Sequence, residues 1–442
     1  MTPNRARVAK IALMEMEPCP SGRNLLAFVG GFCFLHGMSG LWHRALHRFL
    51  VRLYFDRVSI LGAENLPAGG GAVLLGLHRN GAVDGFVYRV PAPQAVYMIS
   101  VQLRRSLLGR LFFDGIEVAR DKDRGKSPGG AALNTGGMEQ CVDLLKRGGS
   151  LCIFPEGTSS LGPRHLPFKS GAAHIAFDCL TGPGKPPAVV PMGIHYEAPT
   201  EFRSRIEVII GKPVSTEMPE GWSRVEKLRE LKRRFEIALE EVGVNVVSDE
   251  YQDTIQRLAC IATLGTKRSY FRTLKQLEKS IPAPLEESWK QLSAEFHRPG
   301  LLFHQGVPLC PIFPLPLMFA VLAVIGPVTL AGWLLNAPPL LAGGWAGRKF
   351  ADGPNVITLW RLLVGVPVFI LWAAIISLTC ALLGRPIWIA VYVVITFAAL
   401  KLTRLTRKVV IEINNGLRHR DLRERALSFH QQLLSTLPDE TI

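Results

Sequence analysis

The sequence contains few cysteines, and none of them forms a recognisable motif. Among its 442 residues there are 8 cysteines, and no two stand in a Cys-x-x-Cys pair. This pattern argues against a disulfide framework and against a zinc site. It predicts a chain that works in a reducing compartment without a bound metal. The cysteines are Cys19, Cys33, Cys141, Cys152, Cys179, Cys260, Cys310 and Cys380.

The sequence also lacks a clear secretion signal and a nucleic-acid-binding motif. Its first 24 residues contain Arg5, Arg7 and Lys10 but no clean apolar core with a small-residue cleavage site, so no cleavable signal peptide is expected. We identify no motif in which basic and aromatic residues are interleaved for nucleic-acid binding, and we expect no nucleic-acid partner.

Acidic residues are scarce relative to basic ones. The chain has 51 Lys and Arg against 36 Asp and Glu, which gives a formal net charge of +15. Such a balance suits nucleic acid, an anionic membrane surface or anionic substrates. The hydrophobic fraction of 48% and the mean hydropathy of +0.21 are high for a soluble protein. Because the C-terminal third is strongly apolar, the lipid membrane is the favoured partner.

Three apolar runs occupy this C-terminal third. Leu315–Leu335 and Leu362–Leu383 are long enough to span a bilayer as helices, whereas Ile387–Leu400 is shorter. By the positive-inside rule the basic tail that follows lies in the cytoplasm, together with the domain before the runs. Both ends on one side require an even number of crossings, so one run is not expected to cross fully. The sequence predicts an integral, multi-pass membrane protein. The basic residues of the tail are Lys401, Arg404, Arg407, Lys408, Arg418, Arg420, Arg423 and Arg425.

Residues 1–57 are expected to form membrane-associating helices. Leu25–Leu41 is apolar and glycine-rich, and it either dips into the membrane or packs as a helix. In the stretch that follows, up to Tyr54, arginines recur every four residues from Arg44 to Arg52 and therefore line one helical face. This pattern is typical of an interfacial helix on anionic lipid, with an ordinary surface helix as the alternative.

Short β-rich runs alternate with helical or loop stretches over residues 58–213. The alternation predicts an α/β domain with a largely parallel sheet flanked by helices. The expected strands are Val58–Leu61, Ala72–Leu77, Ala95–Ile99, Ile116–Ala119, Ser150–Phe154, Ala188–Ile194 and Ile206–Ile210. The expected helices are Leu103–Phe112, Gly136–Lys146 and Ala172–Cys179. Beyond this domain we expect a helical, basic extension over 214–308, a membrane region with two or three apolar helices over 309–408, and a basic C-terminal helix or tail over 409–442.

A histidine follows directly on the second expected strand. The apolar run from Val73 leads into His78, after which come an Asn-Gly turn and Asp84. An imidazole at the end of a strand can accept a hydroxyl proton, and a nearby carboxylate can fix its tautomer and stabilise the imidazolium. By itself, the pair is more typical of a structural histidine that caps a strand.

Two further stretches have the chemistry to hold a phosphate. A strand beginning at Ile116 ends in an arginine, whose guanidinium can bind a phosphate through two hydrogen bonds. The strand Ser150–Phe154 is followed by a Pro-Glu-Gly-Thr-Ser turn, which offers backbone N–H groups and hydroxyls to an anion. An arginine and a lysine shortly afterwards add positive charge. The candidate substrate-binding residues are Arg120, Glu156, Gly157, Thr158, Ser159, Arg164 and Lys169.

A fourth stretch, Ala188–Tyr196, has the pattern of a central strand interrupted by Pro191. In this order, the four stretches resemble the four blocks of the glycerophosphate acyltransferase family: a His–Asp, a Gly…Arg, a Phe-Pro-Glu-Gly and a Val-Pro block. The resemblance covers roughly Val58–Pro213, and it is closest to the fungal-type branch that acts on glycerol-3-phosphate and dihydroxyacetone phosphate. Pro191 would belong to the fourth block, near the acyl or core side.

The resemblance implies an α/β fold and direct transfer of an acyl group from acyl-CoA or acyl carrier protein to a glycerol hydroxyl, without a bound cofactor. His78 would be the general base and Asp84 its orienting partner. Arg120 would help to bind the phosphate of the acceptor, and Glu156 and Gly157 would shape the acceptor site. The family thus implies an acyltransferase of phospholipid synthesis whose catalytic domain faces the cytoplasm.

Two departures from the family pattern bear on the acceptor. Most members place four residues between the histidine and the aspartate, whereas five intervene here, as in the fungal-type branch. Many members have an arginine after Glu-Gly-Thr where this chain has Ser159, so Arg164 or Lys169 must compensate if the acceptor is phosphorylated. The run Gly353–Val364 also resembles a segment of the fungal-type branch. The longer spacing between His78 and Asp84 and this run favour glycerol-3-phosphate.

Three other functions are compatible with the sequence. The acceptor could be 1-acylglycerol-3-phosphate (lysophosphatidate) or another lysolipid. The chain could instead be a hydrolase in which His78 activates water, or an inactive membrane scaffold that retains the fold. The presence of His78, Asp84, Arg120 and Glu156 together argues against the scaffold.

Overall fold

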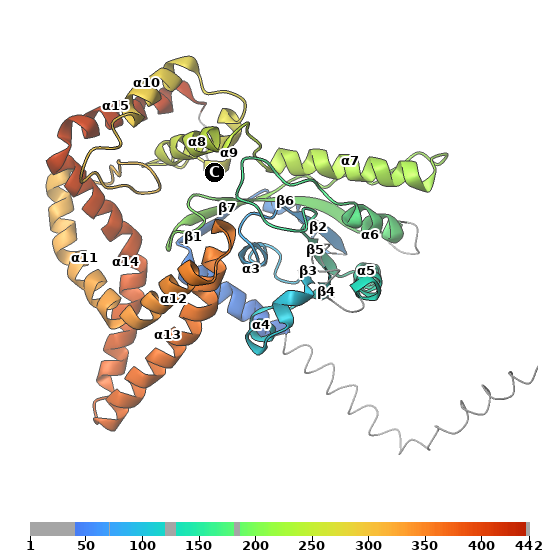
Figure 1. Ribbon diagram of the computed structural model, residues 1–442, viewed down its shortest axis with the longest axis horizontal. Coiled ribbons are helices and arrows are strands. Elements are labelled where there is room, and N and C mark those ends of the chain that lie inside the picture. Colours follow the sequence, from blue (N-terminus) through green and yellow to red (C-terminus); the bar gives the residue numbers. More distant parts are fainter. Residues whose placement is uncertain (1–39, 70, 120–129, 181–185, 439–442) are drawn as a thin grey trace, which may run out of the picture. The chain divides into compact units, whose positions relative to one another are not determined.

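The computed structural model describes residues 40–69, 71–119, 130–180 and 186–438 (Figure 1). The chain forms two compact units, Met1–Leu46 and His47–Ile442, and the sheet belongs to the second. Residues 40–54 are helical, as the spacing of the arginines predicts. The rest of the expected apolar segment Leu25–Leu41 lies outside the described residues.

A seven-stranded sheet forms the centre of the second unit. The strands are β1 (Arg57–Leu61), β2 (Ala72–Gly76), β3 (Val96–Ser100), β4 (Ile116–Val118), β5 (Ser150–Ile153), β6 (Ala188–Tyr196) and β7 (Arg205–Ile210). Their order is β1-β7-β6-β2-β5-β3-β4. Only the β6–β7 pair is antiparallel. The prediction of a largely parallel sheet with seven strands is therefore confirmed.

β2 lies in the middle of this sheet because both of its faces are apolar. Val73, Leu74 and Leu75 are at most 2% exposed, as expected for a parallel strand that is covered on both sides. β2 pairs in parallel with β5 on one side and β6 on the other. The carboxyl ends of these three strands therefore share one edge of the sheet, where the first, third and fourth sequence blocks meet.

Helices cover the sheet, and a capping serine explains where one of them, α4, begins. They are α3 (Val83–Tyr88), α4 (Leu107–Phe112), α5 (Gly130–Lys146), α6 (Gly171–Leu180) and α7 (Arg224–Val242). α4 is shorter than the helix expected over Leu103–Phe112, because Ser106 accepts a hydrogen bond from the N–H of Gly109 and so caps a new helix there. The sequence did not predict α3, whose first turn contains Asp84.

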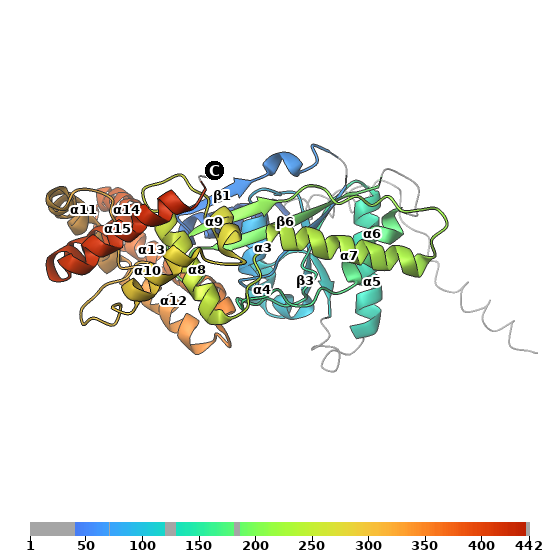
Figure 2. The same ribbon diagram turned by 90° about the horizontal axis from the view of Figure 1, so that it is seen from above.

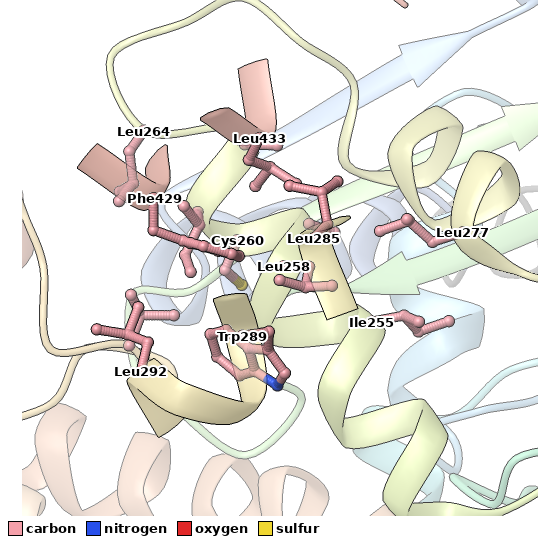
Figure 3. Packing of buried hydrophobic residues seen from close by; sticks show 14 of the residues in the cluster. Ile255, Leu258, Cys260, Leu264, Leu277, Leu285, Trp289, Leu292, Phe429 and Leu433 are labelled. Atoms are coloured by element: carbon pink, nitrogen blue, oxygen red, sulfur yellow. The ribbon is translucent and has the colours of Figure 1, made fainter. Parts of the chain in front are cut away.

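A second hydrophobic core joins the helical extension to the C-terminal helix. It is formed by α8 (Asp249–Ala262), α9 (Tyr270–Leu277), α10 (Ala283–Ser293) and α15 (Arg420–Thr436). Figure 3 shows Trp289 of α10 and Phe429 and Leu433 of α15 packed around Leu258 of α8. The basic C-terminal segment is thus a docked helix. Figures 1 and 2 both show α10 to α15 gathered together, apart from α5 and α6.

Four helices make up the apolar C-terminal region: α11 (Leu315–Leu335), α12 (Ala337–Lys349), α13 (Ile357–Leu382) and α14 (Ile387–Arg418). Within the described residues, α11, α14 and the segment containing α13 are long and apolar enough to cross a membrane. Large apolar side chains near the α13–α14 turn are exposed, such as Leu382 at 79% and Ile387 at 68%. Such a surface is stable in lipid rather than in water, so this region associates with a membrane.

The third apolar run, expected over Ile387–Leu400, is only the first part of α14. This helix is 32 residues long in total, and its basic residues beyond the apolar run pair with carboxylates of the α/β domain. The buried guanidinium of Arg404 lies 3.0 Å from a carboxylate oxygen of Glu197, and Arg407 lies 3.1 Å from Glu201. The end of the apolar region is therefore fixed to the α/β domain by ion pairs.

Candidate active site

His78 and Asp84 contact each other at the carboxyl end of β2. The Nδ1 atom of His78 lies 2.9 Å from Oδ2 of Asp84. β2 ends at Gly76 and α3 begins at Val83, so the intervening residues form a short loop that turns the aspartate back towards the ring. Because the carboxylate accepts the proton on Nδ1, Nε2 is the nitrogen left to accept a proton from a substrate.

The carboxylate of Asp84 has a full set of hydrogen bonds in a site without solvent. It is 0% exposed. Besides the ring of His78, its Oδ2 atom accepts the backbone N–H groups of Arg79 at 2.7 Å and Asn80 at 2.8 Å. The hydroxyl of Tyr196 donates to Oδ1 at 2.6 Å. Burial and this carboxylate raise the pKa of Tyr196 well above its usual value, so the hydroxyl stays protonated and keeps donating.

The third sequence block holds the backbone and the ring of His78. The N–H of His78 donates to Oε1 of Glu156 at 2.8 Å, and its carbonyl accepts the N–H of Ser160 at 3.0 Å. The ring of Phe154 stacks on the imidazole, with 4.3 Å between centroids and 17° between planes. A Cβ atom at position 76 would lie 3.0 Å from the ring of Phe154, so Gly76 leaves room for this stack.

Glu156 uses both carboxylate oxygens on backbone groups. In addition to the N–H of His78, it accepts the N–H of Leu166 at 3.0 Å. Burial raises the pKa of Glu156 above its ordinary value, and the two N–H groups oppose that rise. In this structure the side chain therefore links the turn after β5 to the strand end that carries His78.

Arg79 is half-buried, and its positive charge interacts with the two carboxylates. Its Nη2 atom donates to the carbonyl of Gly162 at 2.8 Å. Burial lowers the pKa of Arg79, whereas the charges of Glu156 and Asp84 raise it. The sequence analysis did not single out Arg79. Its place directly after the histidine is a weak signal, because arginine in a loop is usually exposed.

His78 opens into a cleft with a volume of about 1170 Å³. The cleft has a polar part around His78, Thr158, Ser159 and Lys169. Its other walls are largely apolar and include Phe86, Met98, Ile99, Phe113 and Phe168. Such a space can hold an apolar chain together with an anionic head group next to the imidazole.

The predicted substrate-binding residues occupy different places. Gly157, Thr158, Ser159 and Lys169 line the cleft. Gly157 has a φ of +71°, in the left-handed region that favours glycine, and a Cβ atom there would lie 3.0 Å from Nζ of Lys169. The lysine side chain therefore lies over the turn.

Two other predicted residues, Arg164 and Pro191, lie away from this turn. The Nε atom of Arg164 donates to the carbonyl of Val246 at 3.3 Å, and Arg164 is not among the described residues that line the cleft. Pro191 is buried in β6, opposite Leu75 of β2, and so lies on the core side. Arg120 lies outside the described residues.

Sequence reasoning missed Tyr196 and Phe154 as partners of the dyad. Both stand inside the predicted blocks, one at the end of the fourth and one at the start of the third. Alternation along β6 puts Tyr196 on the face opposite Pro191. This alternation could have pointed to Tyr196, but it does not show that this face of β6 contacts Asp84.

The α/β domain, which contains His78 and Asp84, is similar to known proteins. Residues 57–195 match the family model named Acyltransferase. The glycerol-3-phosphate O-acyltransferase 2 of Saccharomyces cerevisiae is 39% identical over 82 residues, which are 18% of this chain and 11% of that protein. An uncharacterized acyltransferase of Schizosaccharomyces pombe is 24% identical over 53% of this chain and 40% of its own length.

A plant relative and a solved structure are also similar. A chloroplastic 1-acyl-sn-glycerol-3-phosphate acyltransferase of Brassica napus is 26% identical over 39% of this chain and 52% of its own. The chain thus spans about half or less of the length of these curated relatives. The crystal structure of the 1-acyl-sn-glycerophosphate acyltransferase from Thermotoga maritima has a TM-score of 0.33 and 18% identity, over 50% of this chain and 92% of that one. Residues 57–195 are therefore an acyltransferase domain, similar to those of proteins named as glycerol-3-phosphate and 1-acyl-sn-glycerol-3-phosphate acyltransferases.

Proposed function

We propose that this chain is a membrane-bound O-acyltransferase that moves a fatty acyl group from acyl-CoA or acyl carrier protein to glycerol-3-phosphate or dihydroxyacetone phosphate. One observation carries the proposal. Within an acyltransferase domain, the His78–Asp84 pair lies at the rim of a cleft whose walls suit both an acyl chain and an anionic head group. The apolar helices at the C-terminus bring this cleft to the membrane, where the lipid product belongs.

In the proposed reaction His78 acts as a general base. Its Nε2 atom removes the proton of the acceptor hydroxyl while that oxygen attacks the carbonyl carbon of the thioester. The carbon–sulfur bond then breaks, and the thiolate leaves with the proton from the imidazolium as a free thiol. Asp84 keeps Nδ1 protonated and stabilises the imidazolium, so no acyl-enzyme and no bound cofactor are needed.

Lys169 is a cation placed to receive the acceptor's phosphate. It lies over Gly157 and lines the cleft near Thr158 and Ser159. Arg120 remains a second candidate on sequence grounds. The five residues between His78 and Asp84 favour glycerol-3-phosphate, as does the name of the Saccharomyces cerevisiae relative. Lysophosphatidate is the alternative acceptor, supported by the name of the Brassica napus relative.

The membrane region has two full crossings in our proposal. α11 begins beside the end of α14, where the N–H of Cys310 donates to Glu412 at 2.9 Å. The corner between α11 and α12 lies at Asn336, whose amide donates to the hydroxyl of Thr396 at 3.0 Å. Thr396 lies inside α14, so this corner does not extend as far as the α13–α14 turn. α12 returns the chain towards the catalytic domain.

α12 is too short to be a crossing itself. Its 13 residues rise about 20 Å, against about 30 Å of hydrocarbon in a bilayer. We therefore infer that α11 and α12 form a re-entrant hairpin and that α13 and α14 cross the membrane. This arrangement puts the catalytic domain and the basic end of α14 on one side, the cytoplasmic side, as the even number of crossings requires.

Replacing His78 by alanine tests the reaction. We expect His78→Ala to lower the rate of acyl transfer by about 10²- to 10⁴-fold because the base is lost, while the purified protein stays folded. The measurement follows labelled acyl-CoA into lipid. Unchanged turnover by this variant would refute the mechanism. Release of free fatty acid without any acceptor would indicate a hydrolase, and an inactive wild-type protein would indicate a scaffold.

Replacing Lys169 tests the acceptor site. Lys169→Met is expected to raise the KM for glycerol-3-phosphate by about 10- to 100-fold, because a hydrogen bond to a charged group contributes about 1.5–3 kcal/mol. Arg164→Met serves as the comparison, and its KM is expected to stay near the wild-type value. Glycerol-3-phosphate and lysophosphatidate are assayed side by side. The role of Lys169 is refuted if the Arg164 variant, and not the Lys169 variant, changes the KM. The choice of glycerol-3-phosphate as acceptor is refuted if lysophosphatidate is acylated more efficiently.

Cysteine labelling in sealed vesicles tests the membrane arrangement. A cysteine at position 385 (Arg385→Cys), in the α13–α14 turn, is expected to react with an impermeant maleimide from the side opposite to a cysteine at exposed position 220 (Glu220→Cys) of the catalytic domain. The parent protein gives the background. Labelling of both positions from the same side would mean that α13 and α14 do not cross.

A further inference from the structure

We propose that Asn355, which lies just before membrane helix α13, is a positioning residue of the acceptor site. The proposal rests on the acyl-transfer function given above and adds a residue to it from a distant part of the chain. The segment from Asp352 to Trp360 forms one wall of the catalytic cleft, with Asn355, Val356 and Leu359 among its lining residues. The membrane region therefore supplies part of the catalytic site.

The amide of Asn355 holds the turn that follows β5. Its Nδ2 atom donates to the hydroxyl of Ser159 at 2.6 Å and to the carbonyl of Ser159 at 3.1 Å. The next residue, Ser160, donates its N–H to the carbonyl of His78. A displacement of Ser159 is thus passed on to the backbone of the catalytic histidine.

The loop between His78 and Asp84 also packs on this segment. Gly81 has a φ of +56°, and a Cβ atom there would lie 3.0 Å from the carbonyl oxygen of Asn355 and 3.3 Å from Val356. Any larger residue at position 81 would be strained by this φ and would press against Asn355. The same residue therefore contacts both loops of the catalytic site, one through its side chain and one through its carbonyl.

Further hydrogen bonds keep the segment in register with the α/β domain. The carbonyl of Pro199 accepts both the hydroxyl of Thr358 at 2.7 Å and the amide of Asn80 at 3.1 Å. The guanidinium of Arg361 donates to the hydroxyl of Tyr54 at 3.1 Å. The start of α13 is therefore anchored next to the site, and Asn355 is not on a free loop.

This arrangement gives Ser159 a defined task in a chain without the arginine that many relatives have at that position. Asn355 fixes the hydroxyl of Ser159, and Lys169 lies over the neighbouring Gly157. An acceptor head group next to His78 is then confined between this turn and the segment that begins at Asp352. Loss of the amide would loosen one wall of this space, and it would weaken acceptor binding more than binding of the acyl donor.

The experiment compares Asn355→Ala with Asn414→Ala in the full-length protein. Asn414 donates to the carbonyl of Gly300 and does not line the cleft, so its loss controls for the removal of an amide. We expect Asn355→Ala to raise the KM for glycerol-3-phosphate about tenfold, the order expected for lost hydrogen bonds, with the KM for acyl-CoA and the melting temperature unchanged. Asn414→Ala is expected to behave like the wild type.

Two further variants make the test specific. Ser159→Ala should raise the acceptor KM less than Asn355→Ala, because the bond to the backbone carbonyl remains, and the double variant should be no worse than Asn355→Ala alone. Asn355→Asp keeps the shape of the side chain, but its carboxylate repels the carbonyl of Ser159, so this variant should also raise the acceptor KM. It replaces Asn355→Ala if the alanine variant fails to fold.

Each negative outcome has a separate meaning. An unchanged acceptor KM in Asn355→Ala and Asn355→Asp would overturn the role of Asn355 while leaving acyl transfer intact. An equal loss for donor and acceptor together with a lower melting temperature would show that Asn355 is merely structural, which also overturns the proposal. If the wild type shows no acyl transfer that depends on His78, the proposed function itself fails.

Discussion

The buried carboxylate of Asp84 is the interaction on which the rest of the site depends. A carboxylate without solvent is stable only if hydrogen bonds replace its hydration. Asp84 obtains them from the His78 ring, from the backbone N–H groups of Arg79 and Asn80, and from Tyr196. Two adjacent backbone N–H groups can donate to one oxygen only if the loop bends around that oxygen. The carboxylate of Asp84 therefore fixes the conformation of the loop and also the orientation of the imidazole. Because Tyr196 comes from β6, the first and fourth sequence blocks are joined through this group.

A second buried carboxylate, that of Glu156, joins the third block to the first. It accepts the N–H of His78, while Phe154 from the same block stacks on the ring. The charge of Arg79 lowers the pKa of Glu156 and so favours its ionised form. These contacts are possible because β5, β2 and β6 are adjacent and parallel, so their carboxyl ends meet. A further wall comes from the C-terminal segment around Asn355, so the apolar C-terminal region is a structural part of the cleft next to His78.

Local patterns predicted much of this molecule, and contacts between distant segments account for what they missed. Alternation located all seven strands, and the apolar run Leu315–Leu335 coincides with α11. α3 was missed because six residues give little helical periodicity. α14 continues past the expected end, where Arg404 pairs with Glu197, which no local pattern reveals. Arg164 is close to the catalytic turn in sequence, yet its chain direction carries it to Val246. The partnership of Asn355 with Ser159 spans 196 residues, beyond any motif.

The central claim is that Asp84 makes His78 a base by fixing its tautomer and stabilising its charged form. The most direct measurement is acyl transfer from labelled acyl-CoA to glycerol-3-phosphate by the purified Asp84→Asn variant. An asparagine keeps the size of the side chain but no longer stabilises an imidazolium. The account predicts that kcat falls by about 10²- to 10⁴-fold, while the KM values and the fold stay close to those of the wild type. A variant with wild-type kcat would contradict the account.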